Sequence, residues 1–193
     1  MVTITALAMA VPCIAVAGQL PPPAQPDFFR GQVASLKQPV TTFAMGAFGV
    51  QFEEARLSTV RDAIKAGSIG HQGDAGASEY WLCYTAGAGT HAQRVWIVAD
   101  GSMGGPEHRI TSVQAQRTPD EAPTASCPQL PAKFLPLRLD RGAWLGEASA
   151  ARDGWTTYGY AGKRGKYDLT SELSVQTSGG KVVSLSASRI TSD

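Results

Sequence analysis

The sequence has almost no net charge and no long hydrophobic run beyond its N-terminus. Its 193 residues contain 17 Lys and Arg against 16 Asp and Glu, a formal net charge of +1. Nucleic acids and other polyanions are bound through an excess of positive charge, so this balance removes the electrostatic argument for such a partner. A membrane-spanning helix needs about 18 consecutive apolar residues, and none follows the N-terminus, so we expect no integral membrane span in the body of the chain. Apolar residues make up 43% of the chain, enough for a packed core.

Familiar catalytic and metal-binding motifs are also missing. The chain has no C-x-x-C, H-E-x-x-H, EF-hand or G-x-x-x-x-G-K-[ST] string, so zinc, calcium and nucleotide-phosphate sites have no support and no cofactor is predicted. Gly67-Ser68-Ile69-Gly70 has the wrong spacing for a nucleophilic serine on a G-x-S-x-G turn. A loop-borne metal or acid–base site would form if the loops carrying four polar residues met at one end of a sheet: His71, Asp74, Glu107 and His108. Scattered loop residues of this kind are far more often only solvated.

Residues 1–17 are typical of a secretory signal peptide. No charged residue precedes Asp27, and Thr3 to Ala17 (TITALAMAVPCIAVA) form an apolar stretch that ends in small residues at the positions required by signal peptidase. We therefore expect cleavage after Ala17 and a periplasmic or secreted location. A buried helix or a short uncleaved anchor is the alternative, and Pro12 together with the run Pro21-Pro22-Pro23 argues against a helix that continues into the fold.

Cysteine usage agrees with export. Of three cysteines, Cys13 lies inside the predicted signal, and Pro12 directly before it is not the small residue that lipidation of a cysteine requires. Signal removal leaves Cys83 and Cys127, an even number in an oxidising compartment, which favours a disulfide between them. The alternative is two unrelated thiols, with Cys83 simply part of a strand core.

Two proline-rich segments divide the chain. Residues 18–39 begin with GQLPPPAQP, and residues 119–133 contain four prolines, which exclude a helix interior or a central strand. Two units of similar composition remain, residues 40–118 and a shortened unit at residues 134–193.

Each unit has a helical pattern followed by strand patterns. In the first unit, Leu57, Val60 and Ile64 share one helical face, and strand patterns follow at residues 79–85, 94–99 and 108–117. Residues 94–99 are apolar on both faces and therefore central, whereas residues 108–117 are half polar and so face solvent or lie at an edge. The second unit has a helix-like stretch at residues 144–152 and strand patterns at residues 155–160, 169–176 and 181–190. The predicted fold class is therefore α+β, with two tandem helix-plus-antiparallel-sheet units in a loop-rich chain.

This tandem order resembles the β-lactamase-inhibitor-protein architecture and the related SmpA/OmlA-type outer-membrane-assembly lipoproteins. The matching segments are the helix starts Leu57-Ser58-Thr59-Val60-Arg61 and Leu145-Gly146-Glu147-Ala148. The resemblance implies tandem units of helix and antiparallel sheet and, by analogy, a binding role.

Aromatic side chains are the most distinctive feature of the predicted strands. In a strand, successive side chains point to opposite faces, so some rings must face outward, where Trp and Tyr are typical anchors for a protein partner. The alternative is that they fill the core. The predicted binding set is Tyr80, Trp81, Tyr84, Trp96, Trp155, Tyr158 and Tyr160. The predicted function is an exported, non-catalytic binding or inhibitor-like module for an envelope or secreted protein, and the alternative is a small periplasmic hydrolase with the loop-borne site.

Overall fold

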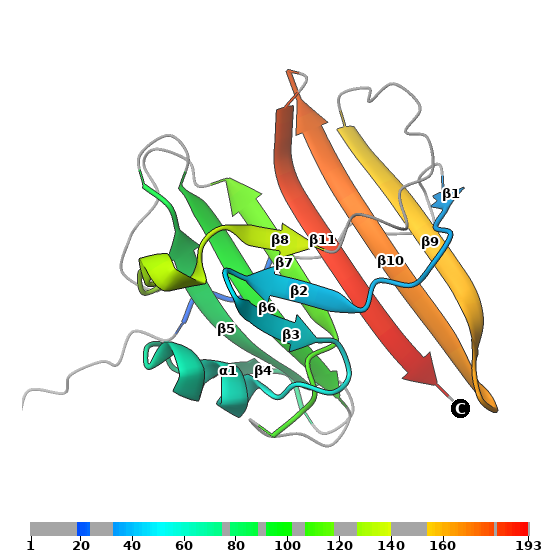
Figure 1. Cartoon of the computed structure of the whole chain (residues 1–193), viewed down its shortest axis with the longest axis horizontal. Coiled ribbons are helices and arrows are strands. Elements are labelled where there is room, and N and C mark those ends of the chain that lie inside the picture. Colours follow the sequence, from blue (N-terminus) through cyan, green and yellow to red (C-terminus); the bar gives the residue numbers. More distant parts are fainter. Residues whose placement is uncertain are drawn as a thin grey trace, which may run out of the picture.

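The fold is built from two β-sheets, seen in a computed structural model that describes residues 19–23, 33–74, 78–88, 92–101, 107–117, 127–139, 154–179 and 181–192. The large sheet has the order β1 (Val33–Ser35), β9 (Gly154–Arg164), β10 (Tyr167–Ser178), β11 (Lys181–Ser192), β7 (Ser112–Arg117), β6 (Gln93–Gly101), β5 (Ser78–Ala86) and β4 (Gly70–Gln72). The small sheet has the order β3 (Phe48–Gln51), β2 (Thr42–Met45) and β8 (Leu137–Leu139). Figure 1 shows the small sheet lying across one face of the large sheet. Only β1 and β9 pair in parallel among these strands.

The predicted α+β fold class was wrong, because the described residues are mostly β-strand. Their one α-helix is α1 (Leu57–Ile64), accompanied by a single 3₁₀ turn at Ala132–Phe134. The predicted second helix at residues 144–152 lies outside the described residues, as does the signal peptide. Strands from both predicted units join one continuous sheet through the pairing of β7 with β11, for example Ala115 opposite Leu185. The described part of the chain contains no helix with the length and apolar character needed to cross a membrane.

Helix α1 itself was predicted correctly. Its buried residues are Leu57, Val60 and Ile64, the same apolar face that the spacing indicates. The helix ends at Lys65, whose left-handed backbone conformation lets its N–H donate to the Arg61 carbonyl at 2.7 Å. It packs against β5 and β6, on the same face of the large sheet as the small sheet.

Strand alternation gives the large sheet two apolar faces. On β5, Leu82 and Tyr84 point toward the small sheet and belong to the main core, whereas Trp81 and Cys83 point to the opposite face. Leu20 packs against the second face, where its carbonyl accepts a hydrogen bond from the Trp96 indole. Beside it, the Gln19 side chain accepts a hydrogen bond from the Cys83 N–H at 2.8 Å. These residues therefore dock onto the sheet as part of the fold.

The predicted disulfide joins Cys83 to Cys127 across this second face. The segment that contains Cys127 is also hydrogen-bonded to Thr85 of β5, whose N–H donates to the Pro128 carbonyl at 2.9 Å. In return, the Leu130 N–H donates to the Thr85 carbonyl at 2.8 Å. The disulfide thus fixes the end of the proline-rich connector to the sheet.

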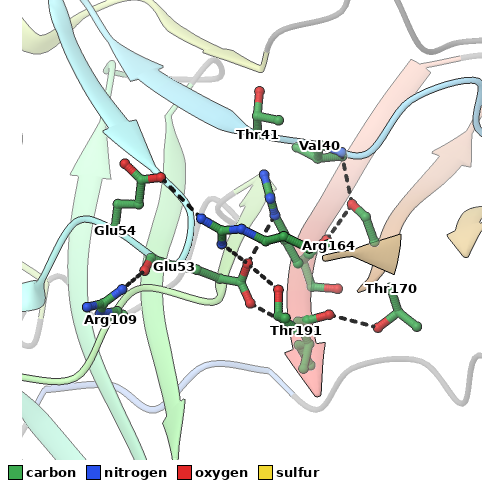
Figure 2. Close-up of polar contacts among 12 residues, drawn as sticks. Val40, Thr41, Glu53, Glu54, Arg109, Arg164, Thr170 and Thr191 are labelled. Carbon is green, nitrogen blue, oxygen red and sulfur yellow. Dashed lines mark hydrogen bonds and ion pairs between the residues drawn. The ribbon is translucent and has the colours of Figure 1, made fainter. Parts of the chain in front are cut away.

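A polar junction around Glu53 joins the turn after β3 to the far part of the large sheet (Figure 2). The Glu53 carboxylate accepts hydrogen bonds from the N–H and hydroxyl of Thr191 at 2.5 and 2.8 Å. It also lies 3.1 Å from Nε of Arg189 and 3.4 Å from a guanidinium nitrogen of Arg164. The Glu53 carbonyl accepts from Arg109 at 3.0 Å. The left-handed backbone of Glu53 (φ 64°) is held by these contacts.

Candidate binding cleft

The four loop residues of the predicted metal or acid–base site do not converge. The rings of His71 and His108 both stack on Tyr80, with centroid distances of 4.4 and 5.9 Å. Glu107 instead pairs with Arg56 at 2.8 Å, and this hydrogen bond holds the pKa of the Glu107 carboxyl below its usual range. Asp74 is exposed. No group of three or more His, Cys, Asp or Glu among the described residues is placed to hold a metal ion.

The aromatic set is divided between core and surface. Of the seven rings, Trp81, Tyr84, Trp96 and Tyr158 are buried, Tyr80 and Tyr160 are half-buried, and Trp155 is 40% exposed. The Tyr84 hydroxyl donates to the Ala66 carbonyl at 3.0 Å, and burial raises the pKa of Tyr84. The indole N–H of Trp96 donates to the Leu20 carbonyl at 3.0 Å. Most of these rings therefore build the fold, and Trp155 is the ring of the set that is open to a partner.

Two carboxyl groups face each other across β5 and β6, where Glu79 is paired in register with Asp100. Partial removal from water raises the pKa of Glu79, and this is the largest effect. A hydrogen bond from Gln72 lowers the pKa, and the negative charge of Asp100 raises it by a smaller amount. Removal from water also raises the pKa of Asp100, opposed by the Thr111 hydroxyl, which donates to it at 3.0 Å. These two groups make the folded state bind protons more readily than the unfolded chain.

Glu79→Gln should therefore flatten the pH dependence of stability. A carboxyl whose pKa is raised on folding stabilises the protein at low pH and loses that contribution as the pH rises through the folded-state pKa. Between the ordinary Glu pKa of 4.5 and neutral pH, the free energy of unfolding should fall less steeply in the variant than in the wild type. Urea unfolding over a series of pH values measures this.

Glu107→Gln is the matched control, because the pKa of the Glu107 carboxyl is lowered on folding. Its removal should change the pH dependence of the free energy of unfolding in the opposite direction. If the free energy of unfolding of Glu79→Gln fell with pH as steeply as that of the wild type, the raised pKa of Glu79 would be contradicted.

A cleft of about 530 Å³ opens between the two sheets at one end of the molecule. The small sheet contributes Phe43 and the edge strand β8, and the large sheet contributes the first residue of β6, the end of β7 and the beginning of β11. The described lining residues are Phe43, Gln93, Ala115, Arg117, Leu137, Arg138, Leu139, Val182, Val183, Ser184 and Leu185. Seven of these eleven side chains are apolar, so the cleft has an apolar wall.

An irregularity in the strand pairing shapes the wall on the β11 side. Gln176 of β10 lies opposite Ser184, but the next residue, Thr177, lies opposite Val182. Val183 is therefore the extra residue of a β-bulge, and both valines line the cleft. Bulges re-aim side chains in this way and are common beside binding sites. Val182 is 49% exposed, an unusual position for a large aliphatic side chain.

The charge of the cleft is positive. Arg117 and Arg138 are its only charged residues among the described lining, and no ion pair joins either of them to a carboxylate elsewhere in the described chain. On β7, Arg117 has the same parity as Val113 and Ala115, which pack toward the small sheet. Arg117 lies opposite Gln93, which also lines the cleft. The apolar wall therefore ends at guanidinium groups that have no carboxylate partner among the described residues.

No family model, curated protein or solved structure matches this chain. The resemblance to the tandem inhibitor and lipoprotein families stays an untested prediction. The feature that indicates a function is the cleft between the two sheets.

Proposed function

We propose that this chain is an exported, non-catalytic binding protein whose ligand site is the cleft between the two sheets. The observation that carries the proposal is the cleft itself, since its volume of about 530 Å³ lies within the range of roughly 300–1,000 Å³ typical of small-molecule sites. Its mainly apolar wall with a few polar groups is also the usual composition of such sites.

Binding is favoured over catalysis by the residues present. Acid–base, nucleophilic and metal-assisted reactions need positioned carboxylate, imidazole or thiol groups. The described lining of the cleft contains no Asp, Glu, His or Cys. The burial of most of the predicted aromatic anchors also favours the cleft over that set as the binding site.

Export is supported by two features of the fold. The Cys83–Cys127 disulfide suits an oxidising compartment. Among the described residues, the first that contacts the sheet is Gln19, two residues beyond the predicted cleavage site after Ala17, so cleavage there would leave these docked residues intact.

Filling the cleft should weaken binding strongly. Ala115→Phe places a ring on the cleft side of β7, whereas Gln116→Phe places the same ring on the opposite face of the same strand. The uncharged dye N-phenyl-1-naphthylamine, which fluoresces strongly in apolar sites, serves as the probe. We expect the wild type and Gln116→Phe to bind it alike, and Ala115→Phe to bind it at least about tenfold more weakly.

Thermal unfolding of each variant checks that the fold is kept. A wild-type protein that does not bind the dye, or a folded Ala115→Phe variant that binds it as well as the wild type, would contradict the proposal.

A further inference from the structure

We infer that the cleft takes a single-chain amphiphile with an anionic head group, of the class of long-chain fatty acid carboxylates. This inference rests on the proposed function and names the ligand class of the same cleft. It is carried by the combination, at one site, of an apolar wall and arginines that pair with no carboxylate in the part of the chain that the structure describes.

The wall accounts for the alkyl chain. Phe43, Leu137 and Leu139 face it from the small sheet, and Val183 and Leu185 from the large sheet. An alkyl chain between these side chains is removed from water on both of its sides. Each methylene buried in this way tightens binding about threefold to fourfold. The cleft volume of about 530 Å³ suits one such chain with its head group.

The arginines account for the head group. A guanidinium presents parallel N–H donors that match a carboxylate, and such charge-assisted pairs are stronger than hydrogen bonds between neutral groups. Arg117 is the last residue of β7 and is exposed, so a head group beside it stays in contact with water while the chain lies among the apolar side chains. Arg138 lies on the edge strand β8, where alternation points its side chain to the face opposite Leu137 and Leu139, so it acts on the head group at longer range than Arg117.

The absence of acidic residues from the described lining sets the selectivity. With two positive charges and no negative one, a cationic head group is repelled, and an uncharged one gains nothing from the arginines. The preference for an anion is therefore a property of the site that can be measured separately from its affinity for alkyl chains.

Three probes with the same alkyl chain separate these contributions: dodecanoate, dodecanol and dodecyltrimethylammonium, each added to the full chain below its aggregation concentration. Displacement of N-phenyl-1-naphthylamine gives their relative affinities. We expect dodecanoate to bind about tenfold more tightly than dodecanol, and the cationic probe to bind most weakly. Added salt should weaken the binding of dodecanoate and leave the affinity for dodecanol unchanged.

Arg117→Gln should reduce the affinity for dodecanoate about tenfold and leave the affinity for dodecanol unchanged. Arg138→Gln should change the affinity for dodecanoate in the same direction. Lys37→Gln is the matched control, because Lys37 is an exposed cation that does not line the cleft.

Equal affinities for dodecanoate and dodecanol, both lost in Ala115→Phe, would overturn the head-group inference but not the proposal that the cleft is a binding site. Preference for dodecanoate that survives in the Arg117→Gln, Arg138→Gln double variant would also overturn it. Failure of every probe and of the dye to bind would overturn the proposed function as well.

Discussion

Loss of the Cys83–Cys127 disulfide is expected to lower the free energy of unfolding by about 4 kcal/mol. The two cysteines are 44 positions apart in the sequence, so the bond restricts a long loop of the unfolded chain. Both are buried on the second face of the large sheet beside Trp81 and Trp96. Without the bond, the segment at Cys127 is held to β5 mainly by its hydrogen bonds to Thr85.

Urea unfolding of the oxidised protein, the protein reduced by dithiothreitol and the Cys83→Ala, Cys127→Ala variant measures this loss. The variant should be as unstable as the reduced protein and should not respond to dithiothreitol. A loss below about 1 kcal/mol in both samples would contradict the role given to the bond, because it is much smaller than the loop-closure effect.

Glu53→Gln is expected to destabilise the protein by about 3 kcal/mol. The carboxylate is the counter-charge of Arg189, whose side chain is only 11% exposed, and it accepts two hydrogen bonds from Thr191. A neutral amide leaves Arg189 largely buried without an opposite charge, and it turns an acceptor oxygen into a donor facing the Thr191 groups.

Glu54→Gln is the matched control for this change. Glu54 is the neighbouring residue and is 49% exposed, and its one ion pair among the described residues is a distant one with Arg164, at 3.7 Å. Exposed pairs of this kind contribute little, so we expect a change within about 0.5 kcal/mol. Equal effects of the two substitutions on the free energy of unfolding would show that the junction around Glu53 does not join the sheets.

The sequence predicted the elements that have a clear internal pattern. Leu57, Val60 and Ile64 gave the buried face of α1, and the long strands β5, β6, β9, β10 and β11 follow from their aromatic and alternating residues. The run from Val95 to Ala99, apolar on both faces, indicated a central strand, and β6 does lie between β5 and β7 with both faces buried.

The elements that were missed or misplaced are determined by tertiary contacts. Strands β2, β3 and β8 have three or four residues each, too few for an alternating pattern to be recognised. Strand β7 was expected to face solvent or to lie at an edge because of its polar residues, yet it pairs with β6 and β11, and Ser112 and Gln114 are buried. The polar residues of this strand are buried by long-range packing, which its own sequence does not show.

The cleft could not be found from local sequence for the same reason. Its lining comes from separate strands, and Phe43 and Leu185 meet only because the small sheet lies across the large one. Val182 reaches the wall through the bulge in the β10–β11 pairing, which depends on register and not on any motif. Conversely, the sequence did place both cysteines of the disulfide, because counting cysteines in an exported chain requires no knowledge of the fold.

Methyl NMR spectra of the leucine- and valine-labelled protein during titration with dodecanoate show whether the ligand lies between the two sheets. We expect the methyl signals of Leu137, Leu139, Val183 and Leu185 to shift together and to saturate at one equivalent. The signals of Leu57 and Val60, buried beneath α1, should stay unchanged. Shifts confined to residues outside the cleft, or no saturable shift at all, would contradict the account of this protein as one that binds its ligand between the two sheets.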